Sequence, residues 1–313
     1  MNFFYLNASE LDSLKHVIGN QGAGFFSCFH STLNQIMWCE EQGKIPVVYW
    51  GENSQYYDAD GYSGRMNAWE YYFEPVSHLT YDKDDIVDNT NRYSAQSQHI
   101  YLEMIDIPFR IKINQLIDKY IRIRPHIKKK IDDFYKLFMT KKRTIGIHLR
   151  GTDKHHEEHV ILLDILINKA NQFADGNTQF YVASEDQQLF DRAKSMLKGP
   201  VISYNVTRVS TDVYQWPALY KNRAQLGEEV LIEAQLLAKC NLLIHTLSNV
   251  SSAVLYFNPN MKNILFYCPS RMQKEKKNNE NFWRKIKKIF SKKEITGDNP
   301  LCAQYFNNFR INR

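Results

Sequence analysis

Two basic residues near the middle of the chain could stabilise a departing phosphate group. Arg150 and Lys154 follow a compact apolar run, 144–149, which predicts a buried strand. Ligands bind just beyond the carboxyl ends of strands in open parallel sheets, so both residues should lie at a ligand-binding edge. A forked guanidinium and a nearby ammonium can stabilise the negative charge of a leaving diphosphate without a metal. The alternative is a structural pair between Arg150 and Asp153.

The surrounding sequence predicts an α/β protein with two lobes, because short apolar runs alternate with helical patterns. The chain should divide into an N-terminal lobe, 1–140, a second lobe, 141–268, and a C-terminal tail, 269–313. The predicted strands cover 16–19, 46–50, 144–149, 179–183, 201–204, 241–245 and 263–267. The predicted helices cover 26–38, two stretches within 107–140, 160–173, 186–197, 227–238 and 249–257, and 51–67 is predicted as an irregular loop.

Size and composition indicate a globular, enzyme-sized protein. The 313 residues are 43% hydrophobic and 24% charged, which suffices for a substantial core. The opening residues have neither a basic flank nor a long apolar run, so no secretory signal or anchor is predicted and a cytoplasmic location is expected. The five cysteines are scattered and lack paired CxxC spacing, which argues against a zinc or redox site.

Two further segments have the composition of phosphate-binding turns. Gly22 and Gly24 precede a predicted helix, so their backbone could approach a pyrophosphate at the positive helix end. An ordinary tight turn is the alternative. Ser248 and Asn249 open the predicted helix 249–257 and could donate hydrogen bonds to phosphate oxygens. A simple helix N-cap is the alternative there.

Five ordered segments resemble one enzyme family. The run from His148 to Lys154 follows the pattern His-x-Arg-x-Thr-Asp-Lys, which is the signature of the alpha-1,6-fucosyltransferases, including the core and the rhizobial nodulation fucosyltransferases. Four other segments are similar to further motifs of that family and keep the same order. Segment 20–24 resembles its glycine loop, and 68–77 resembles its Trp-Glu-x-x-Phe-x-Pro-Val-Ser stretch. Segments 181–186 and 245–252 resemble its second and third motifs. The resemblance leaves the C-terminal tail outside it.

The resemblance implies a GT-B fold, in which two Rossmann-like lobes face a donor-binding cleft, and a reaction that needs no metal or other cofactor. It implies that Arg150 grips the diphosphate of a GDP-sugar, that His148 belongs to the same donor site, and that Lys154 screens the leaving phosphate. It places the family's catalytic glutamate, which takes the proton of the acceptor hydroxyl, at Glu158, with Glu157 as a close competitor.

Three more acidic residues fall within the resemblance. Glu233 stands where the family has an acidic residue that accepts hydrogen bonds from guanine, although this chain has Glu in place of Asp. A solvated carboxylate on an apolar helix is the alternative. Glu185 and Asp186 replace a pair of acidic family residues at another strand end, where they could contact the donor sugar or cap the following helix.

Two other patterns contain residue types that can bind a metal, and no metal is predicted at either. The histidines and glutamates of 155–159 lack the HExxH spacing of zinc enzymes. Asp58 and Asp60 are two residues apart, as in metal sites of the other glycosyltransferase fold, but they follow no apolar strand. Because Gly61 comes next, a solvated turn is favoured.

The tail contains a basic amphipathic pattern. Over 281–293, aromatic residues and isoleucines recur at helical spacing with lysines and an arginine between them. Such a helix could lie on an anionic inner leaflet, beside a lipid-linked acceptor. Packing of the helix on the first lobe is the alternative, and binding to nucleic acid is not predicted.

The resemblance, together with these patterns, implies an inverting, metal-independent transferase that moves L-fucose from GDP-fucose to a glycan hydroxyl, for example in a bacterial surface polysaccharide. Its partners would be the GDP-sugar donor, a glycan acceptor that could be lipid-linked, and the inner face of the membrane, on which it would be peripheral. No residue identifies fucose physically, so another GDP-sugar is an alternative donor. A non-catalytic membrane-surface scaffold is an alternative function.

Overall fold

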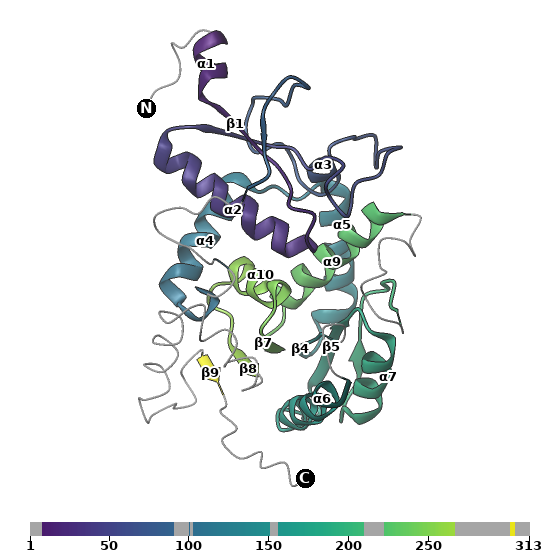
Figure 1. Cartoon of the computed structure of the whole chain (residues 1–313). Helices are drawn as coiled ribbons and strands as arrows, with labels where there is room; N and C mark the ends of the chain where they lie inside the picture. Colours follow the sequence, from purple (N-terminus) through teal and green to yellow (C-terminus); the bar gives the residue numbers. More distant parts are fainter. Residues whose placement is uncertain are drawn as a thin grey trace. The chain divides into compact units, whose positions relative to one another are not determined.

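The chain is an α/β protein with two parallel sheets, as the computed structural model shows (Figure 1). The structure describes residues 8–90, 100, 103–150, 156–209, 222–266 and 301–303; the side chains of 8–9, 103, 156–162 and 301–303 lie outside the description. Two compact units are present, the first made of Met1–Ile131 and Gln215–Ile232, the second of Asp132–Tyr214 and Glu233–Arg313. The resemblance implies that the lobe 1–140 takes the acceptor and the lobe 141–268 binds the GDP-sugar, and this assignment stays a prediction.

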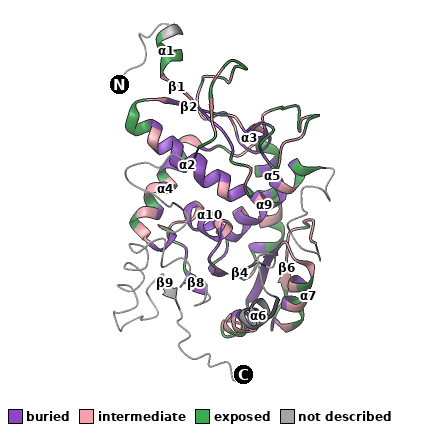
Figure 2. Ribbon diagram, viewed as in Figure 1, coloured by how far each residue is buried: buried purple, intermediate pink, exposed green. Residues whose placement is uncertain are grey.

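The first unit is built on three parallel strands in the order β2-β1-β3. These strands are β1 Lys15–Ile18, β2 Ile45–Val48 and β3 Val87–Asp88. Its helical segments are α1 Ala8–Leu14, α2 Phe25–Gln42, α3 Ala68–Tyr72, the 3-10 turn η2 Glu103–Ile105, α4 Ile107–Tyr120 and most of α5 Pro125–Phe134. Helix α2 makes the crossover between β1 and β2, and Figure 2 shows most of its length as buried.

Aromatic side chains fill the core of this unit. Trp50, Trp69 and Phe73 are fully buried, and the Trp69 ring lies 4.4 Å from that of Phe73 and 5.2 Å from that of Trp50 between centroids. The helix α3 that carries Trp69 is capped by Asn67, whose side-chain oxygen accepts a hydrogen bond from the Trp69 N–H. The tryptophan-containing segment that resembles the fucosyltransferases therefore builds the core.

The predicted loop 51–67 contains no helix or strand and is anchored through Tyr62. The Tyr62 hydroxyl donates to Oε2 of Glu228 at 2.8 Å. Glu228 is buried on helix α9 Arg223–Ala238, where Lys130 also contacts its carboxylate and His126 lies 3.5 Å from it. Because a buried carboxylate is costly without partners, this network holds the loop against α5 and α9 within the first unit.

The second unit contains a six-stranded, wholly parallel sheet in the order β6-β5-β4-β7-β8-β9. The strands are β4 Arg143–Leu149, β5 Thr178–Ser184, β6 Val201–Ile202, β7 Leu242–Thr246, β8 Asn263–Phe266 and β9 Leu301–Ala303. From β4 the chain first winds outward through β5 and β6, and then returns to the other side of β4 with β7. This is the doubly wound order, with its reversal point between β4 and β7.

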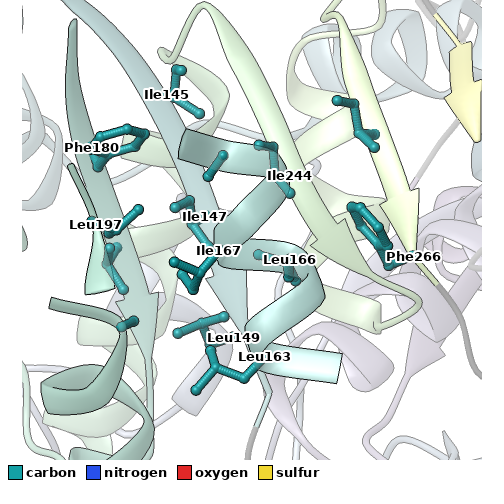
Figure 3. Close-up of a cluster of buried hydrophobic side chains, with 14 of the residues drawn as sticks. Ile145, Ile147, Leu149, Leu163, Leu166, Ile167, Phe180, Leu197, Ile244 and Phe266 are labelled. Carbon is teal, nitrogen blue, oxygen red and sulfur yellow. The ribbon is translucent and has the colours of Figure 1, made fainter. Parts of the chain in front are cut away.

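Helices cover both faces of this sheet, as parallel strands require. The segments are the π-helical turn η3 Tyr135–Met139, α6 His156–Asn171, α7 Gln187–Met196, the end of α9, and α10 Asn249–Phe257. Figure 3 shows the core beneath α6, where Leu163, Leu166 and Ile167 pack on apolar side chains of the strands. The labelled strand residues of this cluster are Ile145, Ile147, Leu149, Phe180, Ile244 and Phe266.

The opposite face of β4 is approached closely by the end of α9. A Cβ added to Gly146 would lie 3.0 Å from both Cys240 Sγ and Leu237 Cδ2. Such contacts are tighter than packed side chains normally make, so a side chain at this position would force Leu237 and Cys240 to shift by a few tenths of an ångström. This approach sets the distance of the end of α9, residues 233–238, from the sheet within the second unit.

Replacing Gly146 with valine should lower the free energy of unfolding by about 1–3 kcal/mol, because the added methyl groups overpack the contact between β4 and α9. Urea denaturation followed by circular dichroism measures this change. Gly176→Val is the matched control, since a Cβ at the exposed Gly176 has no neighbour within 4 Å. Equal losses in the two variants would contradict the packing argument.

Candidate active site

The carboxyl ends of β4 and β7 bring the central predicted residues together within the second unit. His148 and His245 are paired in the register of these two strands, and Arg150 follows β4 directly. Ser248 and Asn249 follow β7 at the start of α10. In doubly wound sheets the crevice between strands at the reversal point is where ligands bind. Predicted residues from two separate segments, 148–154 and 245–252, thus lie at the edge where ligands bind in sheets of this topology.

His148 is a buried, neutral imidazole. Burial, the neighbouring His245 and the positive charge of Arg150 together lower its pKa from 6.5 to about 3, and burial is the largest of the three causes. Its Nδ1 lies 3.5 Å from the hydroxyl oxygen of Ser248. A neutral histidine at this edge can donate or accept a hydrogen bond, and it adds no charge to the site.

Helix capping occupies the side chain of Ser248. Its hydroxyl accepts a hydrogen bond from the Ser251 N–H at 3.0 Å, and the Ser251 hydroxyl accepts one from the Ser248 N–H at 3.1 Å. The N-cap alternative is therefore confirmed for this side chain. The Ser248 N–H is used within this cap, so a phosphate at this helix start would be bound by the N–H groups that follow it. Phosphate binding by Ser248 and Asn249 stays a prediction.

Asp186 also caps a helix. Its Oδ1 accepts a hydrogen bond from the Leu189 N–H at 3.0 Å at the start of α7. Glu185 accepts a backbone hydrogen bond from Val209 at 2.9 Å, which extends the edge of β5 by one bridge. Capping is confirmed for Asp186, while contact of Glu185 and Asp186 with a donor sugar stays a prediction.

Glu233 is buried, so its alternative role as a solvated carboxylate is wrong. Its side chain is 11% exposed, and Oε1 lies 3.8 Å from a guanidinium nitrogen of Arg208. The sequence offered no signal for Arg208, which lies in a stretch without helical or strand periodicity. The predicted contact of Glu233 with guanine stays a prediction, but the carboxylate has a basic neighbour that the sequence did not reveal.

The glycine loop belongs to the first unit. Gly22 has a left-handed backbone (φ 70°), its N–H donates to Asn20 Oδ1 at 2.7 Å, and a Cβ there would lie 3.0 Å from the Asn53 carbonyl oxygen. Gly24 is the exposed N-cap of α2, with open space where a Cβ would be. The tight turn is confirmed at Gly22, and pyrophosphate binding by this loop stays a prediction.

Several predicted residues lie outside the description. Lys154 is among them, and Glu157 and Glu158 are placed only by their backbone, in the first turn of α6. The basic pattern of 281–293 also lies outside. No helix in the described part of the chain is long and apolar enough to cross a membrane.

The aspartates near residue 60 form a turn, as predicted. The Asp60 N–H donates to Asp58 Oδ1 at 3.0 Å, and Gly61 follows with a left-handed backbone (φ 75°). Within the described residues, no three histidine, cysteine or acidic side chains gather as a metal would need. That statement does not extend to the side chains of 155–159.

Comparison with solved structures identifies the fold. Two structures of the NodZ alpha-1,6-fucosyltransferase, one soaked with GDP-fucose and one from Bradyrhizobium, each match with a TM-score of 0.53 and 18% identity, over 81% of this chain and 95% of theirs. A mutant of Arabidopsis thaliana FUT1 in complex with GDP matches with a TM-score of 0.51 and 10% identity, over 82% of this chain and 70% of that one. The chain has the fold of the alpha-1,6-fucosyltransferases. The predicted GT-B class is thereby confirmed, although no protein-family model matches the sequence.

The buried state of His148 predicts a specific pH dependence of stability. Between its ordinary pKa of 6.5 and about 3, the unfolded chain binds a proton at His148 that the folded chain does not, so stability falls as the pH falls through this window. His148→Gln should therefore reduce the loss of unfolding free energy between pH 7 and pH 5 by about 2 kcal/mol. Denaturant titrations at the two pH values test this, and an equal loss in both proteins would contradict it.

Proposed function

We propose that this chain is an inverting glycosyltransferase that moves L-fucose from GDP-fucose to a hydroxyl group of a glycan. The observation that carries the proposal is the position of His148 and Arg150 beside the start of α10, at the reversal point of a doubly wound sheet. The fold supports it, since it is shared with a fucosyltransferase structure soaked with GDP-fucose and with another protein in complex with GDP.

In the proposed reaction, one displacement at the anomeric carbon inverts its configuration. The acceptor oxygen forms the new bond to that carbon on the face opposite the diphosphate. Glu158 takes the acceptor's hydroxyl proton as the bond forms. The bond to the phosphate oxygen breaks at the same time, and GDP leaves with the electron pair.

The chain's own cations would then do the work that a metal does in other transferases. The guanidinium of Arg150 would bind two phosphate oxygens, and Lys154 would place a second positive charge on the leaving group. The N–H groups at the start of α10 would add partial positive charge at the same edge. His148, being neutral, would contribute a hydrogen bond and would leave the charge balance of the site to Arg150 and Lys154.

Removal of these groups should slow the release of GDP from GDP-fucose. Arg150→Ala is expected to lower the rate by about 10²–10³-fold, because it removes charge stabilisation of the leaving group. Glu158→Gln should lower it by about 10²–10⁴-fold, as expected for loss of a general base, whereas Glu157→Gln should retain the rate. Chromatography of the released GDP measures all three.

Arg192→Ala is the matched control for loss of an arginine, because Arg192 pairs with Asp164 at the surface of the second unit. Wild-type rates in both Arg150→Ala and Glu158→Gln would refute the mechanism. Loss of activity on addition of a chelator would show that a metal is required. Faster turnover of another GDP-sugar than of GDP-fucose would assign a different donor on the same fold.

We further propose that the acceptor is a lipid-linked glycan, such as a bacterial surface polysaccharide, met at the cytoplasmic face of the membrane. The support is the basic amphipathic pattern of 281–293 in the sequence. The protein should therefore sediment with vesicles that contain anionic lipid and remain in solution with neutral ones. Replacing the lysines of 281–293 with glutamine should abolish this sedimentation, and unchanged sedimentation would contradict the assignment.

A further inference from the structure

A buried arginine that the proposed mechanism does not use lies near the carboxyl end of β5. Arg208 is carried by the segment that follows β6, and the next residue, Val209, bridges to Asp186 just beyond β5. The Arg208 side chain is 8% exposed, and its guanidinium carbon lies 4.1 Å from the centre of the Phe190 ring. The aromatic face and the burial hold the charged group in one place.

The hydrogen bonding of this guanidinium is incomplete. One terminal nitrogen donates to the Tyr204 carbonyl oxygen at 3.4 Å, which is long for such a bond. The buried Nε has no hydrogen-bond partner among the residues that the structure describes. Buried N–H groups are nearly always bonded in folded proteins, so a group left like this calls for an explanation such as a ligand.

The pair that Arg208 makes with Glu233 is loose for a structural ion pair. The nitrogen and oxygen are 3.8 Å apart, although both side chains are about nine-tenths buried. In the same unit, a guanidinium nitrogen of the half-exposed Arg192 lies 2.8 and 3.0 Å from the two carboxylate oxygens of Asp164. A buried ion pair stabilises a fold only when its geometry is good, so the fold alone gives little reason for this one.

Opposite charges side by side select the kind of ligand that fits. A phosphate would be repelled by Glu233, and a cation would be repelled by Arg208. A neutral ring that offers an acceptor beside donors satisfies both groups. Guanine does so, because its O6 accepts from a guanidinium while the neighbouring N1–H and N2–H groups donate to a carboxylate.

We infer that Arg208 is a specificity-determining residue that reads the O6 edge of the donor's guanine while Glu233 binds the adjacent N–H groups. This inference rests on the proposed use of a GDP-sugar. Adenine presents the reverse pattern, with an amino donor facing the guanidinium and a ring lone pair facing the carboxylate. The pair therefore excludes adenine by repulsion as well as favouring guanine by attraction.

Nucleotide binding by the full chain tests the inference, with GDP, IDP and ADP as ligands in isothermal titration calorimetry. Arg208→Met removes both the positive charge and the bidentate donor geometry of the guanidinium. This variant should reduce the preference for GDP over ADP by about 10- to 100-fold. Arg208→Lys keeps a positively charged donor beside Glu233 and loses the bidentate geometry, so it should keep more of the preference than Arg208→Met does. IDP shares O6 with GDP and lacks only the 2-amino group, so the ratio of GDP to IDP affinity should stay at the wild-type value.

Arg192→Met is the matched control and should keep both ratios. An unchanged GDP-to-ADP ratio in a folded Arg208→Met protein would overturn the inference while leaving the proposed function intact. A parallel fall of the GDP-to-ADP and GDP-to-IDP ratios would also overturn it, since that pattern means general damage to the site. Failure of the wild-type protein to bind GDP would instead refute the proposed function, and the inference with it.

Discussion

The parallel pairing of β4 with β5 on one side and β7 on the other is the constraint on which the candidate site depends. It places the carboxyl ends of three strands at one edge, although their residues are separated by up to about a hundred positions in the chain. His148 and Ser248 approach each other only because this pairing sets β4 and β7 in register. The close contact of α9 with Gly146 depends on the same strand, since a bulkier residue in β4 would push the helix outward. Site and core therefore share one backbone framework.

Much of this framework could be predicted from the sequence, since long buried elements leave strong patterns. The apolar runs of β4 and β5 and the patterns of α2 and α10 were assigned to within a few residues. Short elements cannot be predicted in this way, because α3 has five residues and β3 has two, which are too few to show a hydrophobic period. The order of the strands could not be read directly either, because it depends on pairings between distant residues.

The site was predictable where a residue's role depends on its own position in the chain. Arg150 follows a buried strand, and that alone places it at the ligand edge. Glu233 shows the limit of such reasoning. Its burial and its neighbour Arg208 follow from the packing of α9 against a segment without periodicity, 25 positions earlier in the chain. The tryptophan segment was recognisable as a pattern, but only the structure shows that Trp69 serves the core.

The two helix caps at the ligand edge bear on how such a site can change over evolution. Asp186 and Ser248 hold the starts of α7 and α10 with side chains that Ser, Thr, Asp or Asn could replace at little cost. Substitution among these four residue types would leave both helix starts, and the N–H groups that they present, in place. At these positions the groups offered to a ligand are backbone N–H groups, which do not depend on the identity of the side chain. A comparison of sequences would then not detect these groups, whereas a superposition of folds would.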